Sequence, residues 1–283
     1  MREMVHRTEM SNELFQRLSE FIHDEIGIKM TPAKKTMLET RLARRLKAIH
    51  LPSYHEYCDY LFSAQGISEE LTAMIDVVTT NKTDFFREPG HFEFLVRQAL
   101  PDLVARLGAG VFRPLAAWSA ACSSGEEPYT LAMVLEDFAR GMRGFQYQVL
   151  GTDISTRILD KAKIGIYEEE RTAAIPEVLA RRYLMRSREK QRRLVRVVPE
   201  LRAKVQFRRL NLMEGDFGLR EKMDVIFCRN VLIYFDRPTQ EQLIRHLCNH
   251  LAPGGYLFTG HAESISGFDA PLECAANTVF RRL

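Results

Sequence analysis

A run of small residues between a predicted strand and a predicted helix constrains the fold of this chain most. Residues 115–119 form an apolar strand candidate, residues 120–125 are all small, and apolar residues at helical spacing follow from Glu126. A ligand can approach a backbone only where side chains are small, and Gly125 permits unusual backbone angles. Carboxylates at Glu126 and Glu127 suit the helix dipole but disfavour a phosphate. The stretch predicts a site for a nucleotide-like ligand, with a purely structural turn as the alternative.

The rest of the chain divides into a helical part and an alternating part. Residues 11–80 carry apolar residues at helical spacing throughout. Beyond residue 88, strand candidates alternate with helical stretches, which is the rhythm of a mostly parallel, twisted sheet. The further strand candidates are residues 147–151, 205–209, 224–228 and 255–259. We therefore predict an α/β protein with a Rossmann-like sheet, preceded by an all-helical domain and carrying a small β insertion.

Domain boundaries follow from the same patterns. We expect a helical N-terminal domain at 1–80, a linker at 81–110, and a sheet domain at 111–283 with a basic β-hairpin segment around 181–204. The insertion holds a hairpin candidate, residues 183–186 and 194–197, whose turn lacks the glycines that tight hairpins favour.

Composition is that of an ordinary globular protein, with 46% hydrophobic and 27% charged residues among 283. No window reaches the roughly 18 apolar residues of a membrane span, and the N-terminus lacks a secretory apolar core, so a cytoplasmic protein is expected. Five cysteines without a C-x-x-C pair favour reduced thiols, with neither a disulfide framework nor a zinc site.

Positive charge is concentrated in two segments although the net charge is only +3. Residues 29–50 hold seven Lys and Arg against one Glu, and residues 181–209 hold twelve against two. In the first segment Lys34, Arg41 and Arg45 share one stripe of a predicted helix, with Arg44 one step round. Two basic surfaces suggest acidic partners, whereas a merely solvated helix face is the simpler reading of the stripe.

Polar residues follow several strand candidates, at the edge where parallel sheets bind ligands. Asp153 closes one strand and could accept hydrogen bonds from ribose hydroxyls, although its 28-residue separation from Gly125 exceeds the usual value of about 20. Asn211 follows the next strand candidate, and Arg229 with Asn230 follows another. A structural ion pair for Arg229 and a turn cap for Asn230 are the alternatives.

Six ordered blocks of residues resemble the chemotaxis receptor methyltransferases, which transfer a methyl group from S-adenosylmethionine to glutamate side chains of chemoreceptors. The resemblance covers nearly the whole chain. It implies a Rossmann-like methyltransferase sheet of the S-adenosylmethionine-dependent kind, an all-helical N-terminal domain, cofactor contacts in the linker at 81–110, and a small β insertion around 181–204. It also implies S-adenosylhomocysteine as product and protein-glutamate O-methyltransferase activity in chemotaxis-type adaptation. The blocks are residues 81–88, 118–129, 152–154, 211–212, 227–236 and 260–264.

The resemblance also implies site residues, none of them a metal ligand. Arg87 and Tyr234 are the catalytic candidates, with an aromatic core residue as the alternative for Tyr234. Asp153 suits the ribose diol, and Leu212 with Asn211 suits the adenine, whereas Arg87 suits either the methionine carboxylate or the substrate glutamate. The implied cofactor contacts are Asn81, Thr83, Arg87, Glu127, Asp153, Asn211, Leu212, Arg229 and Asn230.

The implied partner is the cytoplasmic domain of a chemoreceptor, docked on Lys34, Arg41, Arg44 and Arg45. In some family members the β insertion grips a peptide at the receptor's C-terminus, but the glycine-free turn leaves contact with another acidic surface equally open. The sequence leaves two alternative functions: a sensor or scaffold that binds S-adenosylmethionine without catalysis, and, as the less favoured one, an RNA methyltransferase. Nucleic acid is not expected, because no aromatic ladder for stacking bases is present, and neither is membrane insertion.

Overall fold

The structure, a computed structural model, describes residues 9–283 and divides them into two compact units. The first unit contains the described residues up to Thr80 together with Tyr234–Asp236. The second contains Asn81–Ile233 and Arg237–Leu283. Each unit is described by itself below.

The first unit is all-helical, as predicted. Serine hydroxyls begin three of its helices: Ser11, Ser53 and Ser63 each accept a hydrogen bond from a backbone N–H of the first turn, which satisfies an otherwise unpaired donor. Apolar faces converge on a core that includes Leu18, Leu42 and other fully buried side chains. The helices are α1 (Asn12–Ile26), η1 (Pro32–Lys34), α2 (Lys35–Ala48), α3 (Tyr54–Leu61), α4 (Ala64–Glu69) and α5 (Leu71–Val78).

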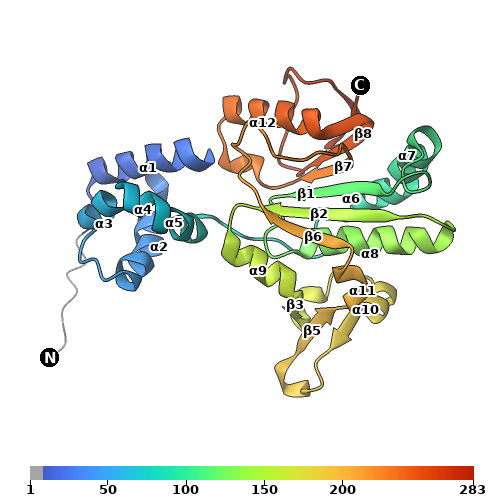
Figure 1. The fold of residues 1–283 in the computed structure, drawn as a ribbon, viewed down its shortest axis with the longest axis horizontal. Coiled ribbons are helices and arrows are strands. Elements are labelled where there is room, and N and C mark those ends of the chain that lie inside the picture. Colours follow the sequence, from blue (N-terminus) through green and yellow to red (C-terminus); the bar gives the residue numbers. More distant parts are fainter. Residues whose placement is uncertain (1–8) are drawn as a thin grey trace. The chain divides into compact units, whose positions relative to one another are not determined.

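A seven-stranded sheet in the order β6-β2-β1-β7-β8-β10-β9 forms the centre of the second unit (Figure 1). Strands β6, β2, β1, β7 and β8 run parallel, and β10 pairs antiparallel with both β8 and β9. All five strand candidates are confirmed, whereas the two C-terminal strands were not predicted. The strands are β1 (Leu115–Ala120), β2 (Tyr147–Asp153), β6 (Val205–Arg209), β7 (Met223–Cys228), β8 (Leu251–Thr259), β9 (Leu272–Ala276) and β10 (Val279–Arg282).

Helices pack their apolar side chains against this sheet. Strand β1 is buried along its whole length, and helix α8 (Glu126–Gly141) buries a continuous run from Glu126 to Leu135. The segment 81–110, expected as a linker and cofactor-contacting segment, belongs to the second unit and contains helical turns of its own. These and the remaining helices are α6 (Pro89–Phe94), η2 (Leu95–Ala99), α7 (Leu100–Leu107), α9 (Thr156–Ile164), η3 (Glu169–Thr172), α11 (Pro199–Arg202), η5 (Leu232–Tyr234) and α12 (Arg237–His250).

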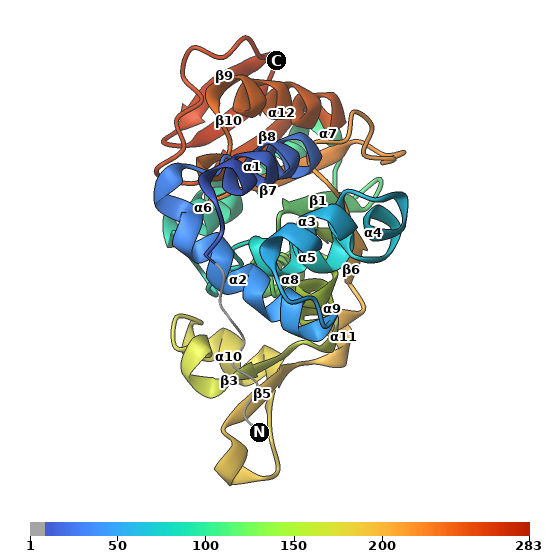
Figure 2. The ribbon, with the colours of Figure 1, turned by 90° about the vertical axis from the view of Figure 1, so that its left-hand side faces the viewer.

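The basic insertion is a separate three-stranded sheet in the order β3-β5-β4. The predicted hairpin is confirmed, since β4 (Leu184–Arg186) and β5 (Leu194–Val197) pair antiparallel after helix α10 (Glu177–Tyr183). Its turn forms without glycine because Arg193, after η4 (Lys190–Arg192), adopts a left-handed φ of 42°. Strand β3 (Ile166–Glu168) was not predicted. In both views the insertion projects at the end of the unit opposite β8 and α12 (Figure 2).

None of the helices within residues 9–283 is long and apolar enough to cross a membrane.

Candidate active site

The loop between β1 and α8 is tightly folded. Ala121 and Ser123 adopt left-handed φ angles of 58° and 51°, which non-glycine residues rarely do, and Gly125 has φ 95°. A Cβ at Gly125 would lie 2.8 Å from Ala162 Cβ and 3.0 Å from Tyr167 Oη. Gly125 is therefore required by backbone conformation and by packing within the protein, in addition to any close approach of a ligand.

Asp153 holds this loop from the end of the neighbouring strand. Its Oδ2 accepts the N–H of Ser123 at 2.9 Å, and its Oδ1 accepts the N–H of Ser155 at 2.9 Å. The carboxylate is nearly buried at 6% exposure. Each carboxylate oxygen can accept a second hydrogen bond. Asp153 thus fixes the loop after β1 and the turn after β2 at the carboxyl edge of these two strands.

Glu127 and Arg229 form a buried ion pair at the same edge. Arg229 Nε donates to Glu127 Oε2 at 2.8 Å, and Ser119 Oγ donates to Glu127 Oε1 at 2.7 Å. Both oxygens of Glu127 are therefore engaged by the protein. The carboxylate at the start of α8 links the ends of β1 and β7.

The Nη1 group of the Arg229 guanidinium also has partners within the protein. Nη1 donates to the carbonyl oxygen of Arg87 at 2.7 Å and to Glu88 Oε2 at 3.4 Å. The rings of Phe92 and Phe227 lie 5.3 and 5.2 Å from its guanidinium carbon. With 1% of its side chain exposed, Arg229 makes the structural ion pair that the sequence left open as an alternative. It joins the segment after Asn81 to strand β7.

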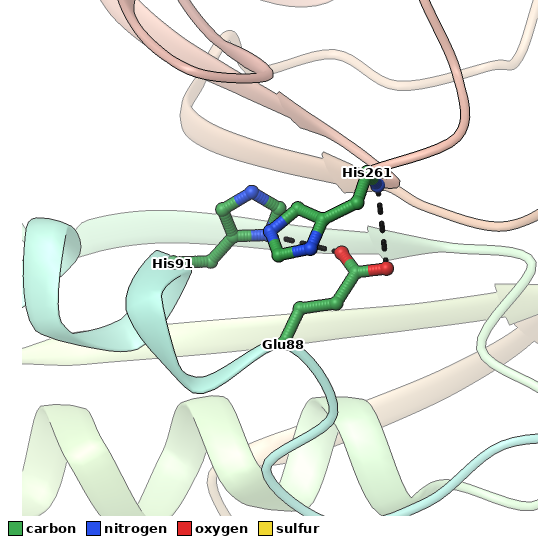
Figure 3. A group of neighbouring side chains, drawn as sticks. All are labelled: Glu88, His91 and His261. Atoms are coloured by element: carbon green, nitrogen blue, oxygen red, sulfur yellow. Dashed lines mark hydrogen bonds and ion pairs between the residues drawn. The ribbon is translucent and has the colours of Figure 1, made fainter.

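Glu88, His91 and His261 lie together beside Arg229 and could in principle hold a metal ion, because their ligand atoms are within 4.8 Å of one another (Figure 3). Arg229 Nη1, however, lies 3.0 Å from His91 Nδ1. A guanidinium is a permanent cation and only donates, so Nδ1 must accept and Nε2 carries the proton toward Thr278 Oγ1 at 2.8 Å. The Arg229 cation takes the place in which a metal would bind, and no metal is assigned.

Burial and the Arg229 charge lower the pKa of His91 to about 4. His91 is therefore neutral at physiological pH, which matches its role as an acceptor for Arg229. Glu88 completes the cluster, because its Oε1 accepts the backbone N–H of His261 and the Asn230 Nδ2 amide, both at 3.3 Å.

The other predicted cofactor contacts also belong to the second unit. Leu212 is buried, and Asn211 Oδ1 accepts the N–H of Met213 at 3.0 Å in the turn after β6. Thr83 is buried, and its carbonyl oxygen accepts Arg171 Nη2 at 2.8 Å. Asn81 is half-buried where this unit begins.

Arg87 is half-buried, and its Nη1 donates to the carbonyl oxygen of Lys82 at 3.3 Å. Within residues 9–283 no carboxylate lies within ion-pair distance of it. In contrast to Arg229, the Arg87 guanidinium thus keeps its charge available for an anionic ligand.

Known proteins match both units. Residues 13–79 match the family described as "CheR methyltransferase, all-alpha domain", and residues 81–280 match "CheR methyltransferase, SAM binding domain". The chain belongs to the CheR methyltransferase family. It is 39% identical over 280 residues to a chemotaxis protein methyltransferase of Klebsiella aerogenes, covering 98% of this chain and 92% of that one. The corresponding protein of Escherichia coli is 38% identical (98% and 93% covered), and that of Borreliella burgdorferi 37% (91% and 90%).

As a CheR methyltransferase the protein uses S-adenosylmethionine, and the second unit fits this cofactor. Ser123 Oγ is buried at the loop after β1 without a hydrogen-bond partner in the described part of the chain. The Asp153 carboxylate lies beside it and accepts the backbone N–H of Ser123. An unsatisfied hydroxyl and a carboxylate at this edge suit a cofactor that bears a ribose and a positive charge.

Tyr234 is the one predicted site residue of this CheR methyltransferase that groups with the first unit. Its carbonyl oxygen accepts the N–H of Lys29 at 2.9 Å, and Lys34 Nζ lies 6.0 Å from its ring centroid. The side chain is half-buried, so an aromatic core residue with its hydroxyl at the surface stays open beside the catalytic role.

The basic stripe of the first unit is only partly free. Arg45 forms a two-point ion pair with Glu70, at 2.7 and 2.6 Å. Arg41 donates to the carbonyl oxygens of Val78 and Thr79 at the end of α5. Arg44 is exposed, and no carboxylate within residues 9–283 pairs with it. Arg41 and Arg45 therefore also stabilise the helical unit, and the role of the four residues in docking stays a prediction.

Several residues that shape the site were not singled out from the sequence. Glu88 and Glu263 lay inside two of the resembling blocks, so their presence there was the available signal. Ser119 lay inside a third block, residues 118–129, whereas His91 carried no signal. Arg171 was equally unremarkable, yet it joins Thr83 to Glu126, whose Oε1 lies 2.7 Å from its Nη2.

Proposed function

We propose that this protein transfers the methyl group of S-adenosylmethionine to glutamate side-chain carboxylates of chemoreceptors, in the cytoplasm. The observation that carries the proposal is the pair of family matches, an all-alpha domain followed by a SAM binding domain, which together span residues 13–79 and 81–280. Relatives that cover nearly the full chain bear the name chemotaxis protein methyltransferase. The substrate named here is the one that this name implies for them.

The proposed reaction makes modest chemical demands. A glutamate carboxylate with a reference pKa of about 4.3 is ionised at neutral pH, so no general base is needed. The sulfonium methyl carbon moves to a carboxylate oxygen, and the sulfur retains the electron pair of the broken bond. Alignment of the oxygen about 3 to 3.5 Å from the methyl carbon supplies roughly 7 to 11 kcal/mol. Positioning and charge are therefore the tasks of the protein.

Cofactor positioning is assigned to the carboxyl edge of the sheet. Asp153 accepts the ribose hydroxyls, Leu212 covers the adenine, and Asn211 meets its polar edge. Glu127 and Arg229 hold this edge together through their ion pair, and both stay in the proposed set of cofactor contacts. Asn81, Thr83 and Asn230 complete the proposed set.

Acceptor positioning is assigned to Arg87 and Tyr234. The Arg87 guanidinium has no carboxylate partner among the described residues, so it is free to bind an incoming carboxylate. Tyr234 offers a hydroxyl donor from a half-buried side chain. Such donors replace the water that the substrate glutamate loses on binding.

Receptor docking is assigned to the first unit. Its proposed contacts are Lys34, Arg41, Arg44 and Arg45, and of these Arg44 is the most exposed. An acidic receptor surface would be drawn to such side chains, chiefly through the association rate.

The decisive test is transfer of labelled methyl from S-adenosylmethionine to purified chemoreceptor cytoplasmic fragments, scored as base-labile ester. Tyr234→Phe should slow single-turnover transfer while leaving cofactor affinity nearly unchanged, because the hydroxyl is assigned to the acceptor. A protein that binds S-adenosylhomocysteine yet labels no receptor would be the non-catalytic sensor instead. A normal rate in Tyr234→Phe would remove its hydroxyl from the reaction.

A further inference from the structure

Glu263, in the loop after β8, binds the backbone of two neighbouring loops. Its Oε2 accepts the N–H of Gly260 at 2.6 Å and the N–H of Asn230 at 2.7 Å, and its Oε1 accepts the N–H of Ile233 at 3.4 Å. The residue is 4% exposed. One buried carboxylate thereby joins the end of β8 to the loop that follows β7.

Backbone donors, and no cation, compensate the Glu263 charge. No lysine or arginine within residues 9–283 forms an ion pair with it. Burial raises the pKa of its carboxyl, and the N–H groups of Gly260, Asn230 and Ile233 act in the opposite direction. A buried carboxylate without a cationic partner is energetically unfavourable, so its presence requires a structural or functional reason.

The loop that Glu263 holds is sharply turned and closely packed. Asn230 has a left-handed φ of 59°, a conformation that asparagine adopts more readily than most other non-glycine residues. A Cβ on Gly260 would lie 2.6 Å from Asn230 Nδ2 and 2.7 Å from Glu263 Oε2. The absence of a side chain at position 260 therefore lets the Glu263 carboxylate reach the Asn230 backbone.

Asn230 is also fixed through its side chain, because Nδ2 donates to Glu88 Oε1 at 3.3 Å. Two carboxylates thus define its place, Glu88 through the amide and Glu263 through the backbone. The same short segment starts at Arg229, which is anchored by Glu127, and continues through Ile233 directly into Tyr234.

We infer that Glu263 is a positioning residue for cofactor binding and methyl transfer, acting through the backbone of Asn230–Ile233 and the start of the connection to Tyr234. This inference rests on the proposed function, and it adds to it a residue that touches neither cofactor nor substrate. Its carboxylate sets the geometry of the segment that carries Asn230 and leads to the proposed hydroxyl donor.

The test replaces Glu263 by glutamine. Glu263→Gln keeps the shape but turns one acceptor oxygen into an NH2 group, which opposes a backbone N–H. We expect faster amide exchange in residues 229–233 and weaker S-adenosylhomocysteine binding by calorimetry. We also expect single-turnover methyl transfer at saturating cofactor to fall by about tenfold or more, since misplacements of about 1 Å can cost 10²-fold.

The matched control is Asp224→Asn, at the opposite end of β7. Asp224 is a fully buried carboxylate that accepts the N–H of Ala116 at 2.9 Å and pairs with Arg113. This variant should lower the melting temperature while leaving transfer, cofactor affinity and exchange at 229–233 within about twofold of wild type, because distant sites act independently. Glu263→Asp, which keeps the charge on a shorter side chain, should fall between Glu263→Gln and wild type. It decides the question should Glu263→Gln not fold.

Unchanged exchange at 229–233 together with unchanged cofactor affinity in the Glu263 variants would overturn the inference. Equal losses in Asp224→Asn would overturn it too, because the effect would then be general destabilisation. Should the wild-type protein methylate no receptor, the proposed function fails. Amide exchange and calorimetry still decide the role of Glu263 in that case.

Discussion

Each unit contains an ion pair between an arginine and a carboxylate. The two arginines look alike in the sequence, but their surroundings differ in the structure. Arg229 of the second unit is 1% exposed, lies beside two stacked phenyl rings, and is bound by Glu127 and the Glu88–His91 cluster. Arg45 of the first unit is 22% exposed and pairs with Glu70, which is 3% exposed. Tyr57 Oη donates to Glu70 Oε1 at 2.9 Å as well.

The comparison shows that a cationic side chain in a functional motif is not necessarily free to bind a ligand. In the Arg229 pair both charges are buried, so removal of either strands the other. In the Arg45 pair only the Glu70 carboxylate is deeply buried. Loss of the arginine therefore destabilises the protein mainly at Glu70 and at the Tyr57 hydroxyl that donates to it. Because the carboxylates are buried in both pairs, the burial of the arginine itself sets the difference in how much each pair contributes to stability.

Arg229→Met should have the largest effect. It leaves the carboxylates of Glu127 and Glu88 without their cation, and breaking a buried pair in this way costs about 3 to 5 kcal/mol. Denaturant unfolding of the second unit measures the loss. Arg181→Met, which removes an exposed pair with Glu177, is the control and should change stability by less than about 1 kcal/mol. Equal losses in the two variants would erase the distinction between the pairs.

The pH dependence at His91 should be nearly as large. His91 has a pKa of about 4 in the folded protein and 6.5 as its ordinary value, so the unfolded chain binds the additional proton between these limits. Stability is therefore lost as pH falls from 6.5 toward 4, by about 2 to 3 kcal/mol at pH 4.5.

His91→Gln should abolish this part of the acid destabilisation, because glutamine can still accept from Arg229 and donate to Thr278 without titrating. Urea unfolding of both proteins at pH 7 and pH 4.5 isolates the difference. Parallel pH profiles would show that His91 is not buried as a neutral group beside Arg229.

Arg45→Met should cost less than Arg229→Met, about 1 to 3 kcal/mol, because a buried acceptor loses a charged partner that is itself partly exposed. Amide exchange across helix α2 reports the loss within the first unit. Arg44→Met on the same helix should stay within about 0.5 kcal/mol, as expected of an exposed side chain. A double variant with Glu70→Gln should recover part of the Arg45 effect, and simple additivity would contradict the pairing.

Substitution of a docking residue should have the smallest effect, and only on the rate of receptor methylation. Arg44→Glu should slow receptor methylation a few-fold at low salt, because long-range steering acts on the association rate. The difference from wild type should vanish at high salt, where the screening length falls from about 10 Å at 0.1 M to about 3 Å at 1 M. Equal rates at low salt would assign Arg44 to a merely solvated face.

Sequence patterns determined the layout of this protein. Helical periodicity predicted the first unit, and alternating strands and helices predicted the parallel part of the sheet with Asp153 at a strand end. These signals are local, since each depends on residues within about 20 positions of one another. The motif blocks also indicated the family, and the match of residues 81–280 to its SAM binding domain confirms it.

Only the tertiary structure decided which charges are free. Arg229 and Glu127 are 102 residues apart in the sequence, and Arg45 and Glu70 are 25 apart, so no periodicity reveals that they meet. The bonds from Glu263 to the Asn230 loop span 33 residues and depend on backbone N–H groups, which every residue but proline carries. Charge, burial and partner are properties of the packed chain, and for this reason Arg229 and Arg45 have carboxylate partners whereas Arg87 has none within residues 9–283.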